Sequence, residues 1–184
     1  MNDTRLLLLL AIIFAASLAI LWVVQAAGFY RRFRGKRLIT CPETKKPEAV
    51  EIATGQGAVR AILGRELRLK DCTRWPERAD CGQECLSQIV EAPDGCLVTS
   101  MVARWYEGQS CAVCGKPFTH LEWHQHRPAL LDAEGRTVQW HDLPAQTLPE
   151  VMLTHKPVCW NCHVHESFRH KHPELVTDRT IRPN

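Results

Sequence analysis

Nine cysteines carry most of the chemistry that this chain of 184 residues can offer. Four of them form two C-x-x-C pairs, Cys111 with Cys114 and Cys159 with Cys162. Two residues between cysteines allow both sulfur atoms to reach one ion from a tight turn, and two such pairs supply the tetrahedral thiolate set that zinc favours. The spacing therefore predicts a structural zinc site with these four cysteines as ligands.

The order of these motifs resembles the treble-clef group of zinc modules over residues 109–173. The resemblance rests on the segment Cys111–Gly115, which suits a knuckle turn, and on Cys159–Cys162 at the expected start of a helix. Gly115 fits the knuckle because such a turn needs a residue that tolerates a positive φ. The resemblance implies a fold element and a zinc site, and it does not imply a particular function.

The second pair also fits a different chemistry. Cys159, Cys162 and His163 match the C-x-x-C-H signature of c-type haem attachment, in which both thiols bond the porphyrin and the histidine binds iron. This alternative predicts a membrane-tethered monohaem electron carrier whose domain faces the periplasm. Zinc is favoured because haem would leave Cys111 and Cys114 without their natural partners. A redox dithiol at that pair is disfavoured, since no βαβ unit surrounds it.

The first half of the chain contains a candidate second metal site. Its ligands would be Cys41, Cys72, Cys81 and Cys85. A helix is predicted over residues 78–91, which places Cys81 and Cys85 one turn apart on the same face. Cys41 and Cys72 are expected in loops that could converge on that face. The alternatives are buried reduced cysteines, as expected for the ninth cysteine, Cys96, or disulfides in an oxidising compartment.

No other residue pattern predicts catalysis. All nine histidines lie between residues 120 and 172, and we interpret them as surface residues around the zinc module. The sequence contains no H-E-x-x-H, P-loop, G-x-G-x-x-G or G-x-S-x-G motif. We therefore expect a binding or scaffolding module, or an accessory subunit of a membrane complex, rather than an enzyme with a small-molecule substrate.

The N-terminal segment is predicted to be a membrane anchor. Leu6 to Tyr30 contains no charged residue, and 25 helical residues rise about 37 Å, enough to cross a hydrocarbon core of about 30 Å. A cleaved signal peptide is the alternative, because residues 25–27 resemble a small-residue cleavage site.

Charge predicts the orientation of this anchor. Arg5 precedes the span, opposed by Asp3, whereas the residues that follow it are more basic: Arg31, Arg32, Arg34, Lys36 and Arg37. Basic flanks stay in the cytoplasm, so the N-terminus is expected outside and the remaining domain inside. The whole chain carries a net charge of +3 and residues 1–37 carry +5, so the rest carries −2. Membrane lipid and a protein are therefore expected partners, and nucleic acid is not.

The elements that must position these residues define an α+β fold stabilised by metal. Strands are predicted at residues 49–52 and 59–63, a helix at 96–107, a hairpin at 129–140, a helix opening at 148–152, and a helix from 160 that stops before 173. The expected domains are a transmembrane helix at 1–30, a basic neck at 31–40, an α+β subdomain at 41–108, a treble-clef-like subdomain at 109–173 and a flexible tail at 174–184. Such small subdomains have little apolar core, so the metal is expected to supply stability.

Overall fold

The computed structural model describes most of the chain, namely residues 2–54, 67–78, 80–119, 121 and 128–176. The chain has an α+β fold with small antiparallel sheets, as predicted, and divides into two compact units, Met1–Val98 and Thr99–Asn184. The strand expected at residues 59–63 lies outside the described residues, as does the part of the expected tail from residue 177 onward.

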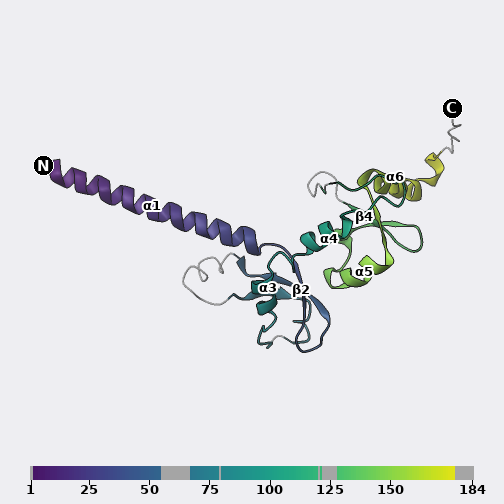
Figure 1. The fold of residues 1–184 in the computed structure, drawn as a ribbon, viewed down its shortest axis with the longest axis horizontal. Helices are drawn as coiled ribbons and strands as arrows, with labels where there is room; N and C mark the ends of the chain where they lie inside the picture. Colours follow the sequence, from purple (N-terminus) through teal and green to yellow (C-terminus); the bar gives the residue numbers. More distant parts are fainter. Residues whose placement is uncertain (1, 55–66, 79, 120, 122–127, 177–184) are drawn as a thin grey trace. The chain divides into compact units, whose positions relative to one another are not determined.

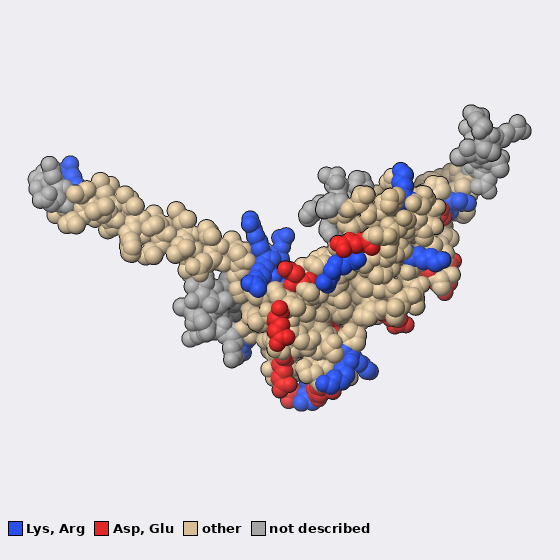
Figure 2. All heavy atoms as spheres, in the orientation of Figure 1, with Lys and Arg blue, Asp and Glu red and all other residues tan. Residues whose placement is uncertain are grey.

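Helix α1, Asn2–Phe33, carries the apolar N-terminal run (Figure 1). It is long and apolar enough to cross a membrane, and none of its most apolar stretch is buried against the rest of the protein. Figure 2 shows an almost uncharged helix surface, with basic side chains gathered where the helix ends. Length and composition fit a membrane span, and they equally fit a signal sequence.

The C-terminal end of α1 is capped by Arg37, one of the basic residues expected to flank the membrane. Its guanidinium donates hydrogen bonds to the carbonyl oxygens of Arg32, Phe33 and Gly35 at 2.5, 2.7 and 3.2 Å. The last carbonyls of a helix lack intrahelical partners and carry partial negative charge, so a cation stabilises them. Arg37 is fully buried, and its charge therefore serves the fold rather than lipid headgroups.

Three strands form the antiparallel sheet of the first unit, in the order β1 (Arg37–Thr40), β2 (Pro47–Ile52) and β3 (Leu69–Cys72). Val50 of the central strand lies opposite Arg37 on one side and Cys72 on the other. The sheet and the short helix α3 (Leu86–Glu91) bury one apolar core, which comprises Ile39, Val50, Ile52, Leu69, Cys72, Cys85 and Ile89. Phe33 packs against the same core, which connects α1 to the sheet.

Two expectations for the first unit are wrong. The helix predicted over residues 78–91 is confined to α3, so Cys85 precedes its first residue and Cys81 lies in an irregular segment. Cys72 is the last residue of β3 rather than part of a polar loop. Gln83, between the two cysteines, has a φ of 58°, which a continuous helix cannot contain.

The second unit contains a smaller sheet with the strand order β5-β4-β6. Its elements are α4 (Val98–Tyr106), β4 (Ala129–Leu131), β5 (Thr137–Gln139), α5 (Leu148–Thr154), β6 (Lys156–Val158) and α6 (Trp160–Lys171), with short 3-10 turns at Trp140–Asp142, Ala145–Thr147 and Pro173–Leu175. The predicted helices at 96–107, 148–152 and from residue 160 are confirmed.

The hairpin predicted at residues 129–140 is also confirmed. Strands β4 and β5 pair antiparallel, and Gly135 has a φ of 79° in the turn between them. The carboxylate of Asp132 accepts a hydrogen bond from the backbone N–H of Arg136 at 2.7 Å, which closes the turn. Strand β6 was not predicted, and it pairs antiparallel with β4 on the side away from β5.

An aromatic cluster packs beside this sheet. Trp105, Tyr106 and Trp140 lie edge to face, and Phe118 meets Tyr106 in the same way at 4.8 Å between ring centroids. The buried Tyr106 hydroxyl donates to the carbonyl oxygen of Ala129 and accepts the indole N–H of Trp140 at 3.1 Å. The indole N–H of Trp105 donates to the carbonyl oxygen of Met152 at 3.1 Å, so all three polar side-chain atoms of the cluster are paired, and Tyr106 ties α4 to strand β4.

Candidate metal centre

The first C-x-x-C pair lies in a tight turn formed by Cys111–Lys116. The N–H of Cys111 donates to the carbonyl oxygen of Lys116 at 2.8 Å, and the N–H of Gly115 donates to the carbonyl oxygen of Cys111 at 2.8 Å. Gly115 has a φ of 73°, as expected for a knuckle. The N–H of Ala112 donates to Pro157 of β6 at 2.8 Å, which ties the turn to the sheet.

The second C-x-x-C pair begins helix α6. Cys159 is the N-cap residue with an extended backbone, and Cys162 falls in the first helical turn. Strand β6 ends at Val158, directly before Cys159, so the sheet delivers this pair to the knuckle. The backbone N–H of Cys159 donates to the sulfur of Cys111 at 3.3 Å.

The four sulfur atoms converge. Sγ atoms of Cys111, Cys114, Cys159 and Cys162 all lie within 4.8 Å of one another, close enough to hold one metal ion. The Sγ atoms of Cys114 and Cys159 are 3.8 Å apart. Cys111 is buried and Cys114 is exposed, so the cluster reaches from the small apolar core to the surface. This arrangement suits a tetrahedral ion bound by thiolates.

The environment shifts the pKa values of three of these thiols in different directions. Burial opposes ionisation of Cys111, but hydrogen bonds from backbone N–H groups, including those of Cys114 and Cys159, lower its pKa to about 7. Burial raises the pKa of Cys159 and of Cys162, and the neighbouring thiols add to this effect at Cys162. Metal ligands must be deprotonated, so a bound cation would displace protons, and acid would favour its release.

His163 does not join the sulfur cluster through a hydrogen bond. Its imidazole is buried, and its Nδ1 lies 2.9 Å from the hydroxyl of Thr137 on β5 and 3.4 Å from that of Ser167. Burial lowers the pKa of His163 against a smaller raising by the charge of Asp142, so the neutral ring is favoured. The imidazole therefore holds α6 against the hairpin.

Four of the five cysteines of the first unit border a pocket of about 250 Å³. Cys41, Cys72, Cys81 and Cys85 all line it. Among the residues that the structure describes, their sulfur atoms do not lie within 4.8 Å of one another, as those of the second-unit cluster do.

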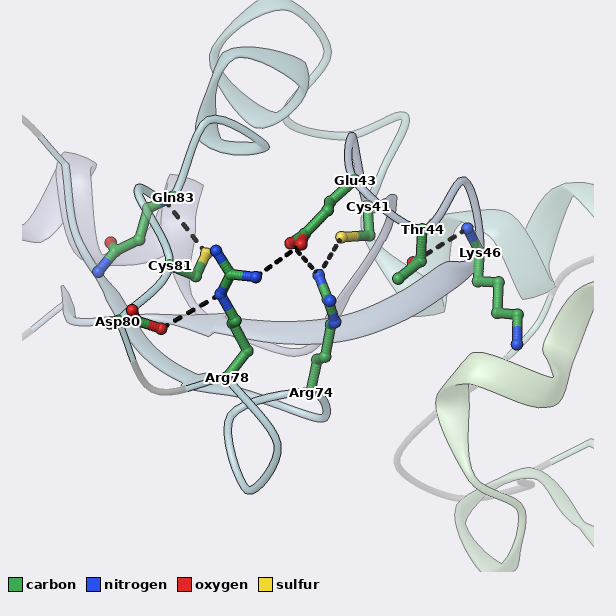
Figure 3. Close-up of polar contacts among 9 residues, drawn as sticks. All are labelled: Cys41, Glu43, Thr44, Lys46, Arg74, Arg78, Asp80, Cys81 and Gln83. Carbon is green, nitrogen blue, oxygen red and sulfur yellow. Dashed lines mark hydrogen bonds and ion pairs between the residues drawn. The ribbon is translucent and has the colours of Figure 1, made fainter.

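Acidic and basic side chains border the same pocket (Figure 3). Arg74 donates to the sulfur of Cys41 at 3.4 Å and to the carboxylate of Glu43 at 2.5 Å. Arg78 reaches the other carboxylate oxygen of Glu43 at 2.7 Å. Hydrogen bonds from the backbone and side chain of Thr44 and from Arg74 lower the pKa of Cys41 to about 7. Burial raises the pKa of Cys72, and it raises that of Cys85 to about 11.

The structure shows that the two units contain the same kind of turn, which the spacing of the cysteines alone does not reveal. The turn Cys41–Lys46 has the same backbone hydrogen bonds as Cys111–Lys116, but Thr44 replaces the second cysteine. The available signal is a Lys-Pro pair whose lysine is the last residue of each turn, Lys46-Pro47 and Lys116-Pro117.

The remaining sequence candidates lie outside the metal centre or outside the described residues. Cys96 packs against the first core, as expected. His165, His170 and His172 are exposed on or just after α6, whereas His120, His124 and His126 are not among the described residues.

Comparisons with protein-family models, curated proteins and solved structures gave no match for this chain. The site must therefore be interpreted from its own geometry.

Proposed function

We propose that the second unit is a treble-clef-like zinc module whose ligands are Cys111, Cys114, Cys159 and Cys162. The observation that carries this proposal is the approach of the four sulfur atoms to within 4.8 Å of one another. A knuckle, a hairpin and a helix that begins at the second pair supply the expected framework. Four thiolates complete a tetrahedral shell, which favours a structural zinc ion over a catalytic one with an open position.

Zinc accounts for more of the site than haem does. Covalent haem would use Cys159 and Cys162 alone, whereas Cys114 lies 3.8 Å from Cys159, sulfur to sulfur. The haem alternative also needs His163 as an iron ligand, and the Nδ1 of that imidazole already faces the hydroxyls of Thr137 and Ser167. Iron could reach only the other ring nitrogen, on a side chain that is buried.

We further propose that α1 anchors the module in a membrane with its N-terminus outside. The exposure of the apolar helix and the basic residues that follow it support this topology. Arg37 and Phe33 hold the end of α1 to the first unit through hydrogen bonds and packing. A membrane helix attached in this way positions the first unit close to lipid headgroups.

The role that best fits this construction is binding or scaffolding, as an accessory subunit of a membrane complex. Large apolar side chains are exposed on the second unit, with Leu153 at 87%, Phe168 at 48% and Val164 at 47% exposure. Exposed apolar side chains are common sites of protein contact. Zinc would fix α6, which carries two of them, against the sheet.

The proposal is tested on full-length protein purified from membranes in detergent. We expect zinc in the protein, no Soret absorption, and a cytoplasmic signal from a reporter fused after Asn184. A Soret band with stoichiometric iron and a periplasmic signal would instead establish the haem protein. Recovery of a soluble chain that lacks α1 would show that the helix is a signal sequence.

A further inference from the structure

The turn Cys41–Lys46 in the first unit has the hydrogen bonds of a metal-binding knuckle. The N–H of Cys41 donates to the carbonyl oxygen of Lys46 at 2.9 Å, and the N–H of Lys45 donates to the carbonyl oxygen of Cys41 at 2.8 Å. Lys45 has a φ of 58°, in the position that Gly115 occupies in the other turn. A left-handed conformation is unfavourable for a residue that carries a side chain, so the surrounding structure must hold this turn in place.

Three further thiols face the pocket beside this turn. Cys72 comes from the end of β3, Cys85 from the residue before α3, and Cys81 from the irregular segment between them. The knuckle supplies one thiol rather than two because Thr44 stands where the other turn has a cysteine. Four thiols from four places therefore replace the two C-x-x-C pairs, and the number of candidate ligands is the same.

We propose that the first unit binds a second divalent cation of the zinc class through Cys41, Cys72, Cys81 and Cys85. Four thiolates around a divalent ion leave two negative charges. Arg74 donates a hydrogen bond to the sulfur of Cys41 and offsets part of that charge, and Glu43 orients this arginine (Figure 3). Completing the shell would require these four sulfur atoms to approach one another across the pocket that they line.

This second site binds its ion more weakly than the site in the second unit. The four thiols of the first unit line the pocket, but among the described residues their sulfur atoms do not form a cluster like that of the second unit, whose sulfur atoms lie within 4.8 Å of one another. Closing the shell orders the segment around Cys81, which lies in neither a helix nor a strand. That ordering subtracts from the binding free energy. The pocket also keeps the site accessible to chelators.

The experiment measures zinc in full-length, detergent-purified protein kept reduced and supplied with zinc. We expect about two zinc ions per chain, and about one in Cys81→Ser. Cys81 is half-buried and outside the first core, so its substitution preserves the fold. Cys96→Ser is the matched control, because Cys96 is also half-buried and in the same unit but does not line the pocket, and it should retain both ions.

Release to a chelator gives an independent measurement. Wild-type protein should lose zinc in a fast and a slow phase, and Cys81→Ser should lack the fast phase. Arg74→Gln should accelerate the fast phase several-fold and leave the slow phase unchanged. One zinc ion in the wild type and in Cys81→Ser, or disulfides among these four cysteines under reducing conditions, would overturn the proposal. Cys114→Ser separates the two sites, since it should remove the slow phase alone.

Discussion

The two units of the protein use a similar cysteine turn in different structural settings. In the first unit the turn joins two strands of a sheet whose core includes Ile39, Val50, Ile52, Leu69 and Ile89. In the second unit the turn meets a sheet whose strands have three residues each. Among the residues that the structure describes, the buried core beside its sulfur cluster consists of Cys111, Ala129 and Val158. The sulfur atoms converge in the unit with less apolar core near the turn.

This difference indicates how stability is divided. Burial of a large aliphatic side chain contributes about 1.5–3 kcal/mol, so the first unit has an apolar source of stability that does not require a metal. Among the described residues beside the sulfur cluster of the second unit, the large side chains of Phe118 and Leu131 are only partly buried. The buried hydroxyl of the aromatic cluster ties α4, rather than α6, to the sheet. We therefore expect the first unit to fold with or without metal and the second unit to depend on it.

The largest expected effect follows from removing the metal of the second unit. Cys162→Ser, or a strong chelator, should abolish the protection of α6 and β6 from hydrogen exchange and leave β1–β3 protected. The reason is that apparent zinc affinities of about 10–16 kcal/mol support the folding of small modules. Cys96→Ser is the control. Protection of α6 that survives complete zinc removal would show that the two units do not differ in this way.

The next effect concerns the apolar core of the first unit. Ile89→Ala should lower the free energy of unfolding of that unit by about 2–5 kcal/mol, because Ile89 is fully buried at the centre of the core. The zinc of the second unit should be retained. Val90→Ala, at an exposed neighbouring position, is the control. Urea denaturation followed by hydrogen exchange measures the loss, and equal midpoints for the two variants would contradict this account of the core.

The cap at the end of α1 should have a smaller effect. Arg37→Met removes charged hydrogen bonds to four carbonyl oxygens and should cost about 1.5–3 kcal/mol. Lys36→Met removes an exposed charge next to it and should change little. Denaturation of the two variants in detergent distinguishes a structural arginine from one that serves only topology, since in the latter case both substitutions would leave stability unchanged.

The smallest effect is a pH dependence within the second unit. Burial raises the pKa of Tyr106, against a smaller lowering by the indole N–H of Trp140. Above the ordinary tyrosine pKa of about 10, the folded chain holds a proton that the unfolded chain releases, so stability should fall as pH rises further. Tyr106→Phe should weaken the unit by about 1–3 kcal/mol at neutral pH and remove this part of the alkaline loss. An unchanged alkaline profile would argue against a buried hydroxyl.

Long or strongly patterned elements could be predicted from the sequence. The charge-free run predicts α1, and the Asp-Ala-Glu-Gly segment at residues 132–135 predicts the turn of the β4–β5 hairpin. The two C-x-x-C pairs predict a cluster because the chemistry of one ion requires all four sulfurs to meet. These features are local, or are imposed by a single ligand.

The features that escaped prediction depend on tertiary partners. Strand β6 has three residues, one of them Pro157, and three residues show no periodicity. Strand β1 lies among basic residues, and its two apolar residues show a strand only once β1 pairs with β2. Cys81 and Cys85 have helical spacing, but the positive φ of Gln83 separates them. In such short segments the sequence pattern does not decide between helix, strand and irregular backbone, because packing against distant residues selects the conformation.

The central claim is that four thiolates of the second unit hold one zinc ion. The most direct measurement is X-ray absorption at the zinc edge of the full-length Cys81→Ser protein, in which the first site is disabled. We predict four sulfur neighbours at about 2.3 Å and no nitrogen or oxygen neighbour. A shell that contains imidazole nitrogen, or a protein that holds iron in place of zinc, would contradict the account.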